Sequence, residues 1–393
     1  MTDWKAVLLH FATDVEDHFD KLKNRLEERL GRGPICIIPY MGYATQNTLH
    51  LKGRVLENKG ITPAGDADSI WQNLHNMYKR MNSDEIAHAR VRARFGEIEQ
   101  EVTADEEGHF TVQLESPTAL PEDQRWFEVE MELIDYPGQQ EAKEATAVGR
   151  VLRPPSNAQF GVISDIDDTV LQTNVLDLLK MARNVFLHNA HTRLPFEGVA
   201  AFYRALQKGT QGTFNPIFYL SSSPWNLYDL LVDFFQMREI PLGPLFLVNL
   251  GLTETQLVSP SHKAHKAARI TTLLNTYSQL PFILIGDSSQ KDPEIYLQAA
   301  IENPGRILSI YIRDVTGEGR DAEVMQMAEK AAEVGTSLLL VPDTAGATQH
   351  AIEHGYMLAE ERAEIAAERA QDKAQPSTVE QLLNAATGSE SSV

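Results

Sequence analysis

The alternation of apolar runs and helical stretches after residue 160 constrains the fold of this chain most strongly. Apolar character is nearly continuous within each run, as in parallel strands that are covered on both faces. The runs are Phe160–Ser164, Pro216–Leu220, Leu245–Val248, Phe282–Ile285 and Ile307–Ile312. Helical stretches lie between them at Pro224–Met237, Ser261–Asn275 and Pro293–Ile301. This order predicts an α/β domain with a doubly wound parallel sheet, which binds ligands beyond the carboxyl ends of its strands.

The part of the chain before residue 156 has a different pattern. Its short β-rich runs are separated by turn signals such as Glu107-Gly108 and Tyr136-Pro137-Gly138. The runs are Pro34–Pro39, Thr48–Leu56, Ala89–Phe95, Phe110–Leu114 and Trp126–Ile134. This pattern predicts a small antiparallel β-sandwich, with a helical insert around Ile70–Met81. No catalytic constellation is visible there, so we interpret this part as a support or binding module.

A length of 393 residues favours two or three domains. We expect an N-terminal amphipathic helix at 1–33, the β-rich domain at 34–155, the doubly wound domain at 156–316, a C-terminal α/β extension at 317–375 and a disordered tail at 376–393. Docking against a neighbouring domain is the simplest interpretation of the N-terminal helix, and a dimerising coiled coil is the alternative.

Charge and cysteine content exclude several functional classes. The net charge of −20 disfavours nucleic acid as a partner, because binding to phosphate backbones needs clustered Lys and Arg. The single cysteine, Cys36, excludes a disulfide framework and a thiolate metal cluster. The first residues lack the features of a signal peptide, and no apolar run approaches the length of a bilayer span. We therefore expect a cytoplasmic protein.

Acidic and hydroxyl residues follow the predicted strands. Asp165-Ile166-Asp167-Asp168-Thr169 follows the first strand, Ser221-Ser222-Ser223-Pro224 the second, and Gly286-Asp287 with Asp292 the fourth, while Lys263 and Lys266 precede the fourth on a helix. Parallel topology would bring these segments to one edge of the sheet. Carboxylates that converge resist ionising together, and a hard cation such as Mg²⁺ removes the conflict. Hydroxyl groups, a lysine and loop amides could hold the oxygens of a phosphoryl group.

These four segments resemble, in order, the four motifs of the haloacid dehalogenase superfamily of phosphatases. More narrowly, three of them resemble the actin-patch-associated phosphatidate phosphatase family: Ser164-Asp165-Ile166-Asp167-Asp168-Thr169-Val170, Tyr219-Leu220-Ser221-Ser222-Ser223-Pro224-Trp225-Asn226 and Gly286-Asp287-Ser288-Ser289-Gln290-Lys291-Asp292-Pro293-Glu294-Ile295-Tyr296. The resemblance covers residues 160–315 well and the β-rich part loosely. It implies a haloacid dehalogenase-like fold and a Mg²⁺-dependent phosphatase.

The resemblance also implies a role for each matching residue. Asp165 matches the nucleophile that forms the covalent intermediate, and Asp167 matches the general acid and base, whose backbone carbonyl also touches the metal. Ser221 and Lys266 match the residues that hold the phosphoryl group. Asp287 matches the acidic metal ligand. The metal set is thus Asp165, Asp167 and Asp287, with Asp292 as outer support or alternative ligand.

Simpler interpretations compete with some of these assignments. The aspartates after the first strand could form a turn, and the serines could cap a helix. Lys263 lies three residues from Lys266 on the same helix and could reach the same place. The apolar segment Val170–Leu187 is either a buried helix or a surface for acyl chains. We interpret Asp168 and Lys291 as local structure, and His188 and His191 as structural, while Arg193 could contact a substrate phosphate.

The hypothesis that follows is hydrolysis of phosphatidate to diacylglycerol and phosphate, with peripheral membrane contact. A second hypothesis keeps the chemistry and changes the substrate to a soluble phosphomonoester, a phosphoprotein or a nucleotide. A third is a catalytically idle binding or scaffold protein. Neither the oligomeric state nor the natural substrate follows from the sequence.

Overall fold

The computed structural model describes residues 34–57, 85–137, 145–167, 169–170, 197–249, 261–316 and 318–374. For residue 230 and for residues 261–263 and 318–319 it describes the backbone alone. The predicted N-terminal helix, the helical insert, the C-terminal tail and almost all of the apolar segment after Val170 lie outside these ranges. The same holds for the side chain of Lys263 and for Asp168, His188, His191 and Arg193.

A six-stranded parallel sheet forms the larger layer, in the order β11-β10-β9-β12-β13-β14. Its strands are β9 (Gly161–Asp165), β10 (Ile217–Pro224), β11 (Leu245–Val248), β12 (Phe282–Asp287), β13 (Ile307–Arg313) and β14 (Ser337–Val341). Strand order reverses between β9 and β12, because β10 and β11 extend the sheet on one side and β13 and β14 on the other. The predicted α/β class with a parallel sheet is confirmed.

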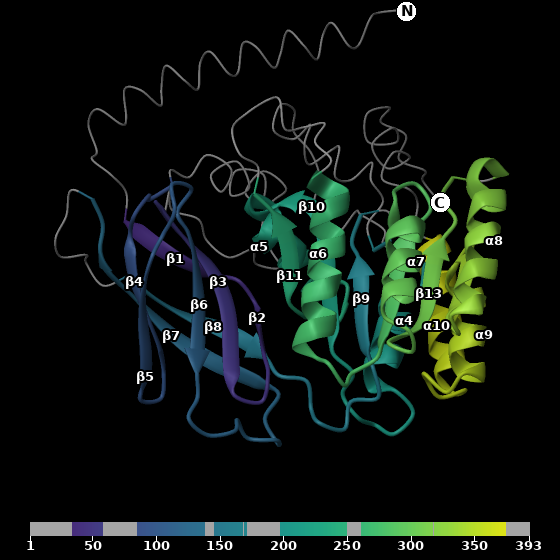
Figure 1. Ribbon diagram of the computed structural model, residues 1–393, viewed down its shortest axis with the longest axis horizontal. Coiled ribbons are helices and arrows are strands. Elements are labelled where there is room, and N and C mark those ends of the chain that lie inside the picture. Colours follow the sequence, from purple (N-terminus) through teal and green to yellow (C-terminus); the bar gives the residue numbers. More distant parts are fainter. Residues whose placement is uncertain are drawn as a thin grey trace, which may run out of the picture.

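Helices cover both faces of this sheet, as Figure 1 shows. They are α4 (Val199–Lys208), the 3-10 turn η2 (Trp225–Leu227), α5 (Tyr228–Met237), α6 (Ser261–Thr276), α7 (Asp292–Glu302), α8 (Glu318–Glu333), α9 (Thr344–Glu353) and α10 (Glu361–Ala374). Neighbouring strand residues point to opposite faces. Val162 packs in the core that includes α4 and α5, and Ile163 packs in the core that includes α6 and α7. This two-sided burial explains the nearly continuous apolar runs of the sequence.

The N-terminal part forms a second sheet of eight strands, drawn in purple and blue in Figure 1. They are β1 (Ile35–Pro39), β2 (Gly42–Ala44), β3 (Thr48–Glu57), β4 (Arg90–Phe95), β5 (Ile98–Thr103), β6 (His109–Glu115), β7 (Trp126–Asp135) and β8 (Thr146–Leu152). All pairs are antiparallel except β2–β8, which is parallel, so the sheet is mixed. The β-rich character is confirmed, and the sandwich arrangement and the domain boundaries stay predictions. Among the described helices, none has the length and apolar character required to span a bilayer.

The two sheets meet close to the serine run of the second predicted motif. The ring of Tyr40 stacks on the ring of Trp225, with centroids 4.2 Å apart and planes inclined by 17°. Arg54 Nη1 donates to Asn226 Oδ1 at 2.7 Å. Trp225 and Asn226 directly follow Pro224, the last residue of β10. The β-rich part therefore packs against the segment that leaves one strand of the predicted site.

The buried His109 of β6 makes stability depend on pH. Burial, and then the charge of Arg54, lower its pKa from 6.5 to about 4, although Asp105 opposes the change. Between these pH values the unfolded chain binds a proton that the folded chain rejects, so the free energy of unfolding falls as the pH falls. This residue should contribute a loss of about 1–2 kcal/mol. Unfolding by urea at pH 4.5 and pH 7 should show a smaller pH effect in His109→Gln; parallel losses in both proteins would contradict the assignment.

Candidate active site

Strand register brings the predicted motifs together at the carboxyl edge of the parallel sheet. Asp165, at the end of β9, pairs in register with Leu220 of β10, directly before the serine run. On the other side of β9, Ser164 pairs with Ile285, two residues before Asp287. These residues therefore lie at the switch point of the strand order, where open α/β sheets bind their ligands.

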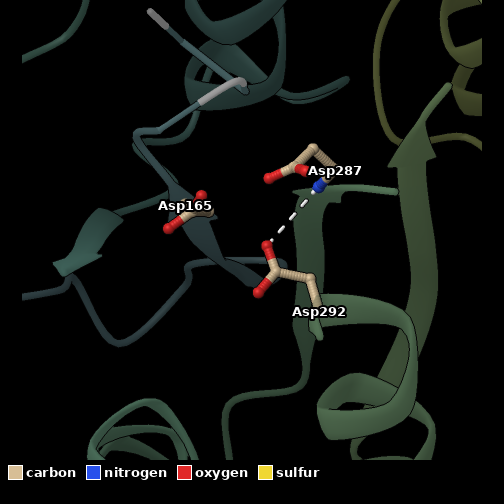
Figure 2. A group of neighbouring side chains, drawn as sticks. All are labelled: Asp165, Asp287 and Asp292. Atoms are coloured by element: carbon tan, nitrogen blue, oxygen red, sulfur yellow. Dashed lines mark hydrogen bonds between the residues drawn. The ribbon is translucent and has the colours of Figure 1, made fainter. Parts of the chain in front are cut away.

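Three buried carboxylates meet at this edge. Asp165, Asp287 and Asp292 each offer an oxygen, and these oxygens all lie within 4.8 Å of one another. Figure 2 shows the side chains of Asp287 and Asp292 facing Asp165 across the edge. Each of the three side chains is completely shielded from solvent. Asp292, expected as outer support or as an alternative ligand, thus offers an oxygen within 4.8 Å of those of Asp165 and Asp287.

Lys266 of α6 neutralises part of this negative charge. Its ammonium group lies 2.8 Å from Asp165 Oδ1 and 2.7 Å from Asp292 Oδ1, and it also donates to Gln290 Oε1 at 3.2 Å. Burial alone lowers the pKa of Lys266, but the two carboxylates outweigh this effect and raise the pKa above its ordinary value. These carboxylates therefore favour the charged form of the lysine.

The surroundings of Asp165 and Asp287 raise the pKa values of both carboxyl groups. Burial raises the pKa of Asp165 well above its ordinary value; Lys266 opposes this, and Asp292, Asp167 and Asp287 add to it. Burial, and then the charge of Asp292, raise the pKa of Asp287 to about 6. A cation beside these carboxylates would favour their charged forms.

Asp287 is held by the loop that follows it. Its Oδ1 accepts hydrogen bonds from Ser289 N at 2.7 Å, Ser289 Oγ at 2.5 Å and Gln290 N at 3.1 Å. Its Oδ2 is buried and has no hydrogen-bond partner. Asp165 Oδ2 is also buried without one. Such oxygens are costly unless a partner arrives, so the geometry leaves two acceptors ready for a ligand.

A hard divalent cation fits these residues. Three carboxylates, two of which carry oxygens without a hydrogen-bond partner, supply the hard oxygen ligands that Mg²⁺ prefers, and the remaining positions can be filled by water and a phosphate. Asp165, Asp287 and Asp292 would hold the ion. The Asp167 carboxylate is outside this set of three, and its predicted backbone contact to the metal stays a prediction.

Asp167 is instead engaged by the serine run. Ser221 Oγ donates to Asp167 Oδ2 at 3.1 Å, and Ser223 Oγ donates to Asp167 Oδ1 at 3.4 Å. The Ser221 hydroxyl also accepts a hydrogen bond from Ser223 N at 2.9 Å. Asp167 and Ser221 are thus brought together, and the predicted contact of Ser221 with a phosphoryl oxygen stays a prediction. The arrangement fixes the side chain that would transfer protons.

Gly286 makes room for Asp292 beneath the site. A Cβ at this position would lie 2.5 Å from Asp292 Oδ2 and 2.8 Å from both Asp292 Cβ and Tyr296 Cε2. Because neither the strand nor the first turn of α7 can shift freely, Gly286→Ala should displace the Asp292 carboxylate. We expect a loss of about 1–3 kcal/mol of stability from this overpacking, together with weaker Mg²⁺ binding. Chemical denaturation and Mg²⁺ calorimetry measure the two effects.

Gly346 provides the control for this substitution. It lies within α9, and the nearest atom to a Cβ there, Val341 Cγ1, would be at an ordinary contact distance of 3.4 Å. Gly346→Ala should therefore stabilise the protein by about 0.5–1 kcal/mol through helix propensity. Equal effects of the two alanines would show that Gly286 has no special role in holding Asp292.

Some residues around the site escaped sequence-based reasoning. Ser223 contacts Asp167, and Gln290 contacts Lys266. Both residues lie inside the motifs quoted above, so their sequence positions could have indicated that they lie near the site. Arg320 of α8 binds the loop after Asp287. It lies beyond the last motif, and no local pattern distinguishes it from other arginines.

Residues 160–314 match the family model described as "Phosphatidate phosphatase APP1, catalytic domain". The resemblance drawn from the four motifs is therefore confirmed for the segment that carries the site.

Two relatives place this match in context. Phosphatidate phosphatase APP1 of Saccharomyces cerevisiae is 36% identical over 155 residues, which make up 39% of this chain and 26% of the yeast protein. An uncharacterized protein of Schizosaccharomyces pombe is 27% identical over 243 residues, or 60% of this chain and 39% of that protein. The chain therefore spans less than half the length of either relative.

The similarity to solved structures is weaker. A carbohydrate acetylesterase from Xanthomonas citri aligns with a TM-score of 0.26 and 11% identity, over 76% of this chain and 66% of the esterase. A similarity of this size supports no conclusion about fold or chemistry.

Proposed function

We propose that this chain is a Mg²⁺-dependent phosphatase with a haloacid dehalogenase-like catalytic domain, and that it hydrolyses phosphatidate to diacylglycerol and phosphate. The observation that carries the proposal is the buried set of Asp165, Asp287 and Asp292 at the carboxyl edge, with Lys266 beside it. The relationship of residues 160–314 to the phosphatidate phosphatase catalytic domain supports the substrate.

In the proposed reaction, Asp165 attacks the phosphorus atom through its carboxylate. The bond from phosphorus to the alcohol oxygen breaks, and an aspartyl phosphate forms on Asp165. Asp167 gives its proton to the departing alkoxide, so the leaving group is a neutral alcohol. Asp167 then takes a proton from water as the water attacks phosphorus, which releases inorganic phosphate and restores both carboxyl groups.

The charges at the site support this sequence of steps. The Lys266 ammonium stabilises the charged form of Asp165 that the attack requires, since it lies 2.8 Å from Oδ1. A bound Mg²⁺ would supply positive charge for the carboxylates and the phosphoryl oxygens. The hydroxyls of Ser221 and Ser223 fix Asp167 for proton transfer. Burial excludes bulk water, which strengthens each of these interactions.

The proposal is tested by phosphate release from phosphatidate in mixed micelles, with Mg²⁺ and with excess EDTA. We expect Mg²⁺-dependent release that exceeds turnover of soluble phosphomonoesters at equal concentration. Higher turnover of a soluble phosphomonoester would keep the chemistry and overturn the lipid substrate. Absence of Mg²⁺-dependent release across a broad substrate panel would overturn the phosphatase itself and favour a scaffold role.

The cellular setting belongs to the same proposal. A lipid substrate requires contact with a membrane surface, and the predicted cytoplasmic location makes that contact peripheral. Cosedimentation with phosphatidate-containing vesicles should exceed cosedimentation with neutral vesicles. Equal recovery in the supernatant for both vesicle types would contradict peripheral contact.

A further inference from the structure

We propose that Arg320 is a positioning residue that holds the loop after β12 so that Asp287 keeps its metal-binding orientation. The inference rests on the proposed Mg²⁺ site. Arg320 lies in the first turns of α8, six residues beyond the segment that matches the catalytic family, which ends at residue 314. The inference therefore assigns part of the site to the C-terminal extension.

The guanidinium group of Arg320 joins the two ends of this loop. Its Nη1 donates to the backbone carbonyls of Ser288 at 2.8 Å and of Gln290 at 2.5 Å. Its Nη2 donates to Glu294 Oε1 at 2.7 Å, on the first turn of α7. A planar guanidinium presents several donors in a fixed geometry, so one side chain can fix three acceptors at once.

One of the two carbonyls that Arg320 binds, that of Ser288, belongs to a peptide unit that holds Asp287. The amides of Ser289 and Gln290 donate hydrogen bonds to Asp287 Oδ1. On the same turn, Arg320 donates hydrogen bonds to the carbonyls of Ser288 and Gln290. Peptide planes are rigid, so an arginine that fixes the carbonyl of Ser288 also fixes the amide of Ser289. Arg320 therefore helps to fix the backbone that binds Asp287 Oδ1, while Oδ2 has no hydrogen-bond partner.

The same loop connects to Lys266. The side chain of Gln290 accepts a hydrogen bond from the Lys266 ammonium at 3.2 Å. Ser288 is held from another side, because its hydroxyl pairs with Thr316 Oγ1 at 2.9 Å and accepts from Val315 N at 3.0 Å. Arg320 binds the backbone of this loop at two carbonyls, so its loss should loosen Asp287 and Lys266 together.

Arg306 provides a matched control. Its Nη2 also donates to backbone carbonyls, those of Leu274 at 3.1 Å, Tyr277 at 2.8 Å and Leu280 at 3.0 Å. It directly precedes β13, at the amino edge of the parallel sheet, opposite the carboxylates. Arg306→Met and Arg320→Met therefore remove the same kind of interaction, and only one of them lies at the site.

The test measures Mg²⁺ binding to the full chain by isothermal titration calorimetry, without substrate. Loss of partners behind a metal ligand typically costs 10- to 100-fold in metal affinity, so we expect Arg320→Met to raise the Kd for Mg²⁺ about 10-fold or more. Arg306→Met should leave this Kd within about twofold of the wild type, although it lowers the unfolding temperature. Arg320→Lys, which keeps the charge and can bind one carbonyl, should lie between wild type and Arg320→Met.

Several results would overturn the inference. One is an unchanged Kd in Arg320→Met, and another is an equal rise in Kd for Arg306→Met, which would reveal general destabilisation. If Arg320→Met does not fold, Arg320→Lys provides the test. A wild-type Kd for Mg²⁺ in Arg320→Lys would contradict the role proposed for the guanidinium group. Failure of the wild type to bind Mg²⁺ at all would instead overturn the proposed function, so the two failures are distinguishable.

Discussion

Asp165→Asn is expected to lower Mg²⁺-dependent phosphate release by at least about 10³-fold while leaving a folded protein. An amide oxygen is a poor nucleophile toward phosphorus, and an amide cannot form the proposed aspartyl phosphate. Asparagine has nearly the same size and shape as aspartate, so the packing at the end of β9 should not change. The loss should appear in kcat, because the substrate can still contact Lys266 and the serines.

The stability of this variant is the more discriminating measurement. In the wild type, Asp292, Asp167 and Asp287 all raise the pKa of Asp165, which means that they oppose its ionised form. Neutral asparagine removes this repulsion, while the Lys266 ammonium keeps Asp292 at 2.7 Å. In EDTA, we therefore expect Asp165→Asn to unfold at a temperature no lower than the wild type.

Asp135→Asn is the control for the change in charge. Asp135 is the last residue of β7 in the β-rich sheet and forms an ion pair with Arg90 at 2.8 Å. That variant should keep full activity and near wild-type stability, since exposed ion pairs contribute little. Substantial phosphate release by Asp165→Asn would remove Asp165 from its assigned role, whatever the fold.

The parallel sheet could be predicted from the sequence because its strands are buried on both faces. Each predicted strand differs from the observed one by no more than a few residues. The run Pro216–Leu220 is the clearest exception, since β10 extends to Pro224 through three serines that no hydrophobic pattern would assign to a strand. Convergence of Asp165, Asp287 and Lys266 followed from topology, because parallel strands present their carboxyl ends at one edge.

Two strands of the β-rich sheet, β5 and β2, were not predicted from the sequence. Strand β5 (Ile98–Thr103) alternates between half-buried and exposed residues and contains only two large apolar ones, so its pattern is weak. Strand β2 (Gly42–Ala44) has three residues, and its parallel partner β8 lies about a hundred positions later in the chain. Pairings this distant depend on tertiary packing, which local sequence does not encode.

The sequence left the place of Asp292 open for a related reason. Its motif position is compatible with outer support of the metal and with direct ligation. Its proximity to Asp165 depends on the absence of a Cβ at Gly286, since that atom would lie 2.5 Å from Asp292 Oδ2. The geometry of a third carboxylate is therefore set by a glycine six positions earlier and by the path of the loop between them.

Lys266→Met should produce the largest loss of stability of any single substitution at this site. The Lys266 side chain is 3% exposed, and its ammonium group lies 2.8 Å from Asp165 and 2.7 Å from Asp292. Methionine keeps most of the volume and removes the charge, which leaves two fully buried carboxylates without their cation. Breaking a buried ion pair by removing one partner typically costs about 3–5 kcal/mol. Urea unfolding in EDTA at pH 7.5 measures this loss.

The loss should depend on pH with a defined sign. Lys266 lowers the pKa of Asp165 in the wild type, against burial and its acidic neighbours, so in Lys266→Met the pKa of Asp165 rises further. A folded state with a raised carboxyl pKa binds more protons than the unfolded state, and its free energy of unfolding then decreases as the pH increases. The difference in the free energy of unfolding between the wild type and Lys266→Met should therefore increase from pH 5 to pH 8.

A double substitution separates the charge effect from lost packing. Lys266→Met with Asp292→Asn removes the cation together with one of the two anions that it neutralises, so the double variant should be more stable than Lys266→Met alone. The coupling energy of this cycle should be about 1–3 kcal/mol, as for contacting charged residues in one network. Additivity of the two substitutions would mean that Lys266 stabilises the site by packing alone.

Mg²⁺ can replace the positive charge that Lys266→Met removes. The ion should therefore raise the unfolding temperature of Lys266→Met more than that of the wild type. An equal rise in both proteins would indicate that the lysine and the metal act on different carboxylates.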